Sequence, residues 1–164
     1  MPEAVVLAID PSINDIGFVY LTKQGDFVGS KHFKPPKGCK NVVEKVASIS
    51  KQIQKEIESC SVEICEIVIE HTRYFAQNQR TSHASAQKLN LAKGAIYGVC
   101  LCHGIEKVQL VWVPGFKKEY ANLLARSCSL PKLTQHERDA FWLGHTWVNS
   151  PKVIKQAWLE SPDL

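Results

Sequence analysis

The chain has 164 residues, of which 45% are hydrophobic and 22% are charged, and its formal net charge is +4. These values predict a single soluble globular domain that is long enough to bury a core. No apolar run approaches the roughly 20 residues that cross a bilayer, so a transmembrane protein is excluded. The mild positive charge is compatible with a nucleic-acid partner without requiring one.

The cysteines carry little functional signal. None of the six forms a Cys-x-x-Cys pair of the kind that binds metals. The apolar run at 4–9 is too short for a signal peptide and leads into an Asp. We therefore expect reduced, mostly buried thiols and a cytoplasmic location, which is the host cytoplasm if the chain is phage-encoded.

The first third of the chain predicts three antiparallel strands and a helix. Apolar, β-rich segments at 4–10, 16–22 and 27–33 are separated by turn-forming residues, as in a meander. After a proline-rich break, Asn41 can cap a helix whose apolar residues recur at helical spacing as far as Ile57.

Strands and helices alternate in the rest of the chain. Consecutive apolar residues, which are typical of buried strands, predict strands at 64–69 and 108–113. Helical patterns predict helices at 82–103 and at about 116–127, and Thr134 is a candidate N-cap for a last helix that ends at about Val148.

The order β-β-β-α-β-α-β-α predicts an α/β fold with one mixed five-stranded sheet flanked by helices. We assign residues 1–150 to this domain and 151–164, which contain two prolines, to an irregular C-terminal tail.

Acidic residues close two of the buried strands. Asp10 follows the apolar run at 5–9, and Glu70 follows Ile69. A carboxylate at the end of a buried strand costs free energy to desolvate unless a cation or hydrogen-bond donors compensate it. His136 and Asp139 share one face of the last helix, since residues three apart are neighbours. Together these four residues predict a site for one or two divalent ions, and hence metal-assisted hydrolysis.

Each of these residues also has an ordinary explanation. An Asp before Pro is often a turn residue, and Asp139 could be a solvated residue favoured by the helix dipole. His136 could be a metal ligand that shifts the preference from Mg²⁺ towards Mn²⁺, or a general base. The occurrence of all four in one β-rich domain favours the functional interpretation.

The ordered set of motifs resembles the RuvC-type Holliday junction resolvases, which are RNase H-like nucleases. The resemblance spans about residues 4–148 and keeps the order and spacing of the family. It rests on Asp10-Pro11-Ser12 with Gly17, on Val68-Ile69-Glu70 followed by the aromatic loop at 74–78, on the Ala-Gln-Lys-Leu-Asn-Leu-Ala-Lys-Gly segment at 86–94, and on His136-x-x-Asp139-Ala140.

The resemblance implies a crossover junction endodeoxyribonuclease of DNA recombination and repair that acts on branched DNA as a homodimer, with Mg²⁺ or Mn²⁺ in a two-ion site. Metal ligands and catalytic residues would be Asp10, Glu70, His136 and Asp139. Lys118, or its neighbour Lys117, would be the basic residue near the scissile phosphate. DNA contacts would be made by Arg73, Tyr74, Phe75, Arg80, Lys88 and Lys117, and Lys93 is a further candidate for a backbone contact.

Some features depart from the family pattern. Ser12 stands where glycine is common, and 71–73 add a residue before the aromatic loop. The family's glycine- and lysine-rich stretch after the fifth strand is missing, since 119–132 are short and contain no glycine. That stretch helps to grip DNA, and such trimming would suit a divergent bacteriophage or bacterial relative. Small residues at 90, 94, 98 and 102 form a stripe that serves either dimerisation or close packing on the sheet.

Three other functions compete with junction resolution. A different nuclease of the same fold, acting on flaps, forks or RNA–DNA hybrids, would have a similar metal site. Residues 10–17 also resemble the first phosphate loop of actin-like ATPases. An ATPase of that kind would need a second domain and a second Asp-x-Gly element. A non-catalytic branched-DNA-binding protein would not need all four metal-type residues.

Overall fold

The computed structural model describes residues 3–71, 83–113, 117–153 and 155–156. Its six-stranded sheet has the order β3-β2-β1-β4-β5-β6. Strands β1, β4 and β5 are parallel, and β2, β3 and β6 pair antiparallel with their neighbours. The strands are β1 (Val5–Asp10), β2 (Ile16–Leu21), β3 (Phe27–Phe33), β4 (Ile64–His71), β5 (Val108–Trp112) and β6 (Lys155–Gln156).

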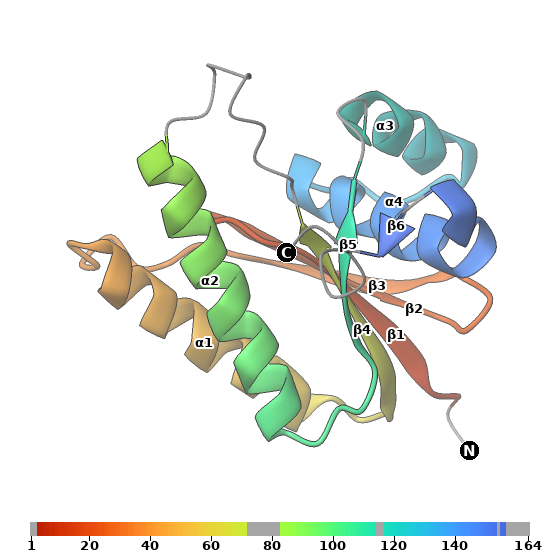
Figure 1. Cartoon of the computed structure of the whole chain (residues 1–164). Helices are drawn as coiled ribbons and strands as arrows, with labels where there is room; N and C mark the ends of the chain where they lie inside the picture. The colour runs from red at the N-terminus through yellow and green to blue at the C-terminus, as the bar shows by residue number, and fades with distance from the viewer. Residues whose placement is uncertain (1–2, 72–82, 114–116, 154, 157–164) are drawn as a thin grey trace.

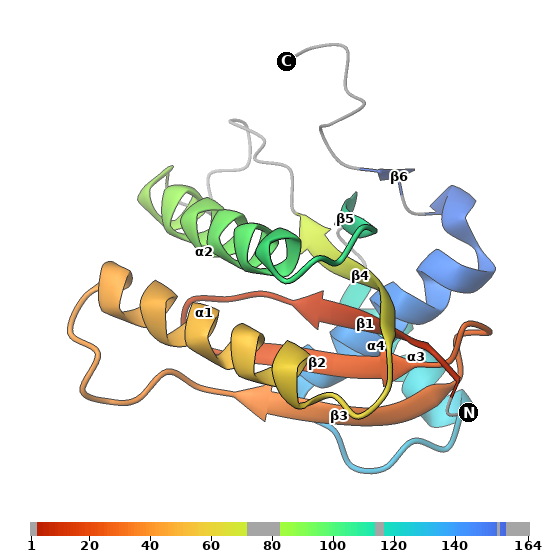
Figure 2. The ribbon, with the colours of Figure 1, turned by 90° about the horizontal axis from the view of Figure 1, so that it is seen from below.

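Helices cover both faces of this sheet (Figures 1 and 2). One layer consists of α1 and α2, and the other consists of α4 with α3 outside it. The helices are α1 (Val42–Ser59), α2 (His83–Cys102), α3 (Lys117–Ser127) and α4 (Gln135–Asn149), and the 3₁₀ turn η1 (Pro151–Val153) follows α4.

The predicted α/β fold is confirmed, and the predicted elements agree with the observed ones to within one or two residues. The expectation of an irregular C-terminal tail is wrong for its first residues. The 3₁₀ turn η1 follows α4 directly, and β6 pairs with Val111 and Trp112 of β5. A two-residue strand carries no periodicity that a sequence pattern could reveal.

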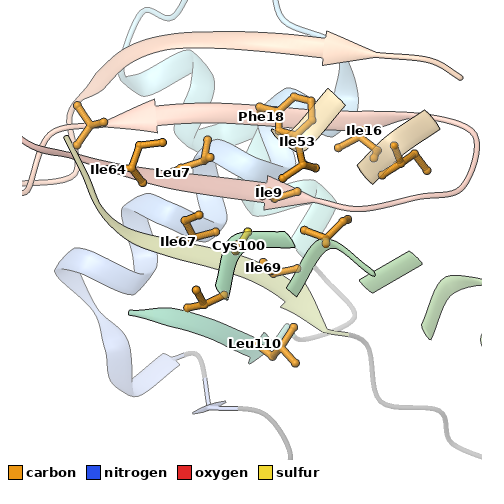
Figure 3. Close-up of a cluster of buried hydrophobic side chains, with 14 residues drawn as sticks. Leu7, Ile9, Ile16, Phe18, Ile53, Ile64, Ile67, Ile69, Cys100 and Leu110 are labelled. Carbon is orange, nitrogen blue, oxygen red and sulfur yellow. The ribbon is translucent and has the colours of Figure 1, made fainter. Parts of the chain in front are cut away.

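Side chains of β1 alternate between the two helical layers. Val5, Leu7 and Ile9 belong to the core under α1 and α2, which Figure 3 shows in close-up. Val6 and Ala8 face the other way, into the clusters shared with α3 and α4. Each fully buried Leu or Ile contributes about 1.5–3 kcal/mol. The same alternation directs the next residue, Asp10, towards α4.

Both predicted N-caps are confirmed. The side chain of Asn41 accepts a hydrogen bond from the backbone N–H of Glu44 at the start of α1. At the start of α4, Thr134 and Glu137 form a capping box, and the Ser30 hydroxyl of β3 also donates to Glu137. Burial alone would raise the pKa of Glu137, but the hydrogen bonds from Thr134 and Ser30 hold it below its usual value.

The α2 helix does not use its stripe of small residues to pack on the sheet. A Cβ added at Gly94 or Gly98 would meet no atom within 4 Å among the described neighbours. The stripe also includes Asn90 and Cys102, which are exposed. Close packing on the sheet therefore does not explain it.

Two further expectations concern the burial of the cysteines and the absence of a membrane-spanning segment. All six cysteines are free, but only Cys100 is buried, so the expectation of mostly buried thiols is wrong. Among the described residues, no helix combines the length and apolar character that a membrane crossing requires.

A non-glycine residue in the left-handed region ends α3. Ser129 has φ 51°, and its N–H donates to the carbonyl of Arg126 while the next N–H, of Leu130, donates to that of Ala125. This pair of bonds is a Schellman motif, whose left-handed position is usually occupied by Gly because a Cβ is strained there. A serine at this position explains how the linker between α3 and α4 turns without glycine.

We expect Ser129→Gly to stabilise the fold by about 0.5–1 kcal/mol. Relief of the left-handed strain, about 1–2 kcal/mol, exceeds the roughly 0.4–1 kcal/mol lost to the freer unfolded chain. Urea unfolding measures the change. The control Ser127→Gly, at the last helical residue of α3, should destabilise by a few tenths of a kcal/mol. A loss of stability in Ser129→Gly would contradict the strain argument.

Candidate active site

The two strand-end carboxylates lie next to each other. Ile9 of β1 is opposite Ile69 of the parallel neighbour β4, so Asp10 and Glu70 follow at the same edge of the sheet. On β4, Val68 packs in the α4 layer, and Glu66 accepts a hydrogen bond from Trp147 of α4. Strand alternation therefore directs Glu70 to the α4 face, the same face as Asp10.

Gly17 allows the start of α4 to lie against the sheet beside Asp10. It is the register partner of Asp10 on β2. A Cβ at this position would be 2.3 Å from the carbonyl carbon of His136 and 2.6 Å from the backbone nitrogen of Glu137. Only a residue without a Cβ permits this contact between the strand and the backbone of α4. The position of His136 therefore depends on Gly17.

His136 and Asp10 form a direct pair. The imidazole Nδ1 lies 2.6 Å from Oδ2 of Asp10. The side chain of Asp10 is 7% exposed and that of His136 35% exposed. The hydrogen bond to Asp10 is the largest influence on the pKa of His136 and raises it, burial lowers it, and the charges of Asp10, Asp15 and Asp139 raise it further, with a net upward shift. Because the pair favours the protonated imidazole, His136 can compensate the buried carboxylate of Asp10.

Asp139 completes the group from the next turn of α4. It is buried, and its Oδ1 accepts a hydrogen bond of 2.7 Å from Nε2 of Gln135. Its charge acts on His136, which places the two side chains in one electrostatic environment. Asp10, His136 and Asp139 thus share one electrostatic environment, and the strand register puts Glu70 at the same end of the neighbouring strand.

The donor set suits a hard divalent cation in its chemistry. The three carboxylates are suitable ligands for Mg²⁺ and Mn²⁺, and an imidazole among them favours Mn²⁺. In this structure Oδ2 of Asp10 is engaged by His136, and the described residues form no group of three or more His, Cys, Asp or Glu arranged to hold an ion. Rotation of the half-exposed imidazole away from Asp10 would free that oxygen for a metal. The residues therefore fit the implied ion by donor type, and two of them, Asp10 and His136, are paired with each other in this structure.

The other predicted site residues have varied positions. Lys118 is exposed on the first turn of α3, and Lys88 is exposed on α2. Lys93 is only 4% exposed, so it cannot reach a DNA backbone, and that prediction is wrong. The predicted contacts Arg73, Tyr74, Phe75 and Arg80, and the side chain of Lys117, lie outside the described residues.

Sequence reasoning missed a second His–Asp pair beside the first. His32 of β3 is the register partner of Gly17, and its Nε2 pairs with Oδ1 of Asp15 in the β1–β2 turn. The Nζ of Lys34 lies 3.9 Å from Oδ2 of Asp15. The available signal was the alternation of β3, which puts Ser30 and His32 on the α4 face.

The comparisons with known proteins concern structure alone. No family model and no curated protein matches the sequence. The structure of Thermus thermophilus RuvC in complex with a Holliday junction substrate matches with a TM-score of 0.67 over 94% of this chain and 99% of that chain. A second Thermus thermophilus RuvC structure gives 0.66 over 93% and 99%. The fold is that of RuvC. The identities of 16% and 18% explain why this RuvC-type fold is not detected by sequence comparison.

We expect Gly17→Ala to destabilise the protein by about 1–3 kcal/mol or more, because the new methyl group would meet backbone atoms that cannot rotate away. Guanidinium unfolding measures the loss. The matched control is Gly29→Ala on the neighbouring strand β3, where an added Cβ would meet nothing within 4 Å. Equal stability of the two variants would show that α4 does not depend on Gly17.

The raised pKa of His136 predicts a pH-dependent contribution to stability. The protonated imidazole is favoured in the folded state, so the pair stabilises the fold fully below about pH 6.5, the usual histidine pKa, and loses this effect as pH rises through the folded pKa. In EDTA, the stability advantage of the wild type over His136→Asn should shrink between pH 6 and 8.5. An NMR titration should give a His136 pKa above 6.5 that falls in Asp10→Asn. Unfolding curves that stay parallel across this range would contradict the pairing.

Proposed function

We propose that the chain is a metal-dependent, structure-selective DNA endonuclease that resolves four-way junctions. The observation that carries the proposal is the Asp10–His136 pair at the end of a strand of a RuvC-type sheet, with Glu70 at the same end of the neighbouring strand. The matched Thermus protein was solved with a Holliday junction substrate, which supports the same class of DNA for this chain.

The four residues have separable roles in this proposal. Asp10 and Glu70, on neighbouring strand ends, would hold the divalent ions, and Asp139 would complete the ligand set from α4. Bound divalent ions would supply Lewis-acid activation of water and stabilisation of the departing 3′ oxygen of the phosphodiester. His136 would alternate between its pair with Asp10 and the substrate side, as a ligand or as a base that takes a proton from the attacking water.

Positive and aromatic residues would bind the DNA around this site. Lys118 is exposed on α3, which starts from the same edge of the sheet as the carboxylates because β5 runs parallel to β4. It would neutralise the scissile phosphate or its neighbour. The aromatic residues Tyr74 and Phe75 of the 72–82 segment would stack on junction bases.

Two opposed nicks require two sites, so we propose a homodimer. The exposed stripe along α2 that includes Gly94 and Gly98 is accessible to a second copy, since it is not packed on the sheet. We also propose that residues 1–150 form the nuclease domain, to whose sheet β6 adds an edge strand.

The deciding experiment is cleavage of an end-labelled four-way junction, flap, fork, linear duplex and RNA–DNA hybrid, each with Mg²⁺, Mn²⁺ or EDTA. We expect symmetric, metal-dependent nicks in the junction. Preferential cutting of flaps or hybrid would assign the same site to a different nuclease. Binding of the junction without cleavage in any metal would leave a DNA-binding protein.

Asp10→Asn and Glu70→Gln should each lower the cleavage rate at least about 100-fold. Loss of a group that only hydrogen-bonds to a metal ligand already costs about 10- to 100-fold in activity, and loss of a ligand itself should cost more. Junction binding in Ca²⁺ and the unfolding midpoint serve as controls for folding. Gln109 of β5, a half-buried residue of the same sheet, offers a comparison substitution, Gln109→Glu, outside the proposed ligand set. Normal cleavage by either acid-to-amide variant would remove that residue from the site.

A further inference from the structure

A basic hollow lies beside the first turn of α4, on the side roughly opposite His136. It has a volume of about 480 Å³ and is enclosed by the end of α3, the 128–133 linker and the first turn of α4. Three cationic side chains line it, Arg126, Lys132 and Arg138, and no acidic residue is among its described lining residues. Such a concentration of positive charge in a concave surface attracts anions.

Arg138 is held in a fixed orientation at the base of this hollow. Its Nε donates to Oδ1 of Asn122 on α3, Nη1 to the carbonyl of Leu133, and Nη2 to Oε1 of Gln135. These bonds use three of the five N–H donors of the guanidinium and leave two for a ligand. A guanidinium whose side chain is already ordered loses little entropy when it binds a phosphate.

The end of α3 does not oppose an anion here. The last carbonyls of a helix carry partial negative charge that would repel a phosphate. In this structure the carbonyls of Leu124, Ala125 and Arg126 accept hydrogen bonds from the backbone N–H groups of the following turn. The Schellman motif therefore satisfies these carbonyls, while Arg126 and Lys132 extend into solvent.

The hollow is placed to follow a strand of DNA past the candidate active site. Arg138 follows His136 by two residues, which puts the two side chains on roughly opposite sides of the first turn of α4. The helix is about 10 Å across, or about three steps of a DNA strand at 3.4 Å each. Along α3, Lys118, Asn122 and Arg126 are spaced four residues apart, so a row of polar and basic side chains leads to the hollow.

We infer that this hollow binds a backbone phosphate of the DNA substrate about three nucleotides from the cleaved bond. The inference rests on the proposed nuclease function and adds to it a second phosphate site, built from Arg126, Lys132 and the fixed Arg138. An acidic protein segment is the competing occupant, but it would not explain why the hollow adjoins the turn that carries His136.

The test is DNA binding by Arg126→Gln/Lys132→Gln, measured by fluorescence anisotropy with a four-way junction in Ca²⁺ over a series of salt concentrations. Loss of the contact with this one phosphate should weaken binding and reduce the slope of log K against log salt by about 0.9. The matched control is Lys51→Gln/Lys55→Gln on α1, where both lysines are exposed on the other layer. It removes the same charge and should leave the slope unchanged.

The outcomes separate this inference from the proposed function. A wild-type slope in the Arg126/Lys132 variant, with cleavage intact in the wild type, would overturn the hollow and leave the nuclease. A reduced slope in the variant, together with a wild type that binds the junction but never cuts it, would support the hollow and overturn the nuclease. Equal slope changes in the variant and the α1 control would show a general charge effect and overturn the phosphate site. A wild-type protein that binds no junction would overturn both the phosphate site and the nuclease function.

Discussion

The contact between Gly17 and the backbone of α4 is the constraint on which the rest of the site depends. Residues opposite one another in a sheet share a face, and the register sets Asp10, Gly17 and His32 side by side across β1, β2 and β3. Glu70 extends this row on β4. The missing side chain at Gly17 leaves a gap in the row, and the start of α4 fills it. His136 is thereby brought to Asp10 without any long side chain having to reach across.

Two further small residues continue this close approach along α4. A Cβ at Gly144 would meet Ala8 and Leu21 of the sheet, and Ala140 packs in the same cluster. At its start, α4 is fixed by the capping box and by Ser30 of β3. The helix that carries His136 and Asp139 is therefore positioned along its whole length, which is the precision that a metal site or a proton transfer needs.

Much of the fold and the identity of the acidic residues could be predicted from the sequence, because they depend on local patterns. Apolar, β-rich runs predict the strands, and the side chains of Asn41 and Thr134 predict the N-termini of their helices. Asp10 and Glu70 were identified because a charge at the end of a buried strand conflicts with its surroundings. The contact at Gly17 could not be predicted, since it joins residues more than a hundred positions apart. The His32–Asp15 pair, the burial of Lys93 and the pairing of β6 are likewise products of tertiary structure.

The negative charge of the candidate active site gives a physical reason for a basic hollow close to it. Asp10, Glu70 and Asp139 present negative charge to a polyanion, and the Asp10–His136 pair compensates only part of it. Charges interact over a screening length of about 8 Å at physiological salt, which is comparable to the width of α4. Arg126, Lys132 and Arg138 would thus be close enough to offset the repulsion of DNA, and Arg138 forms no direct ion pair with Asp139 because Gln135 bonds to both side chains. Under the proposal, a linker between α3 and α4 without glycine would still hold DNA there, because Lys132 lines the same hollow as Arg126 and Arg138 after the turn at Ser129.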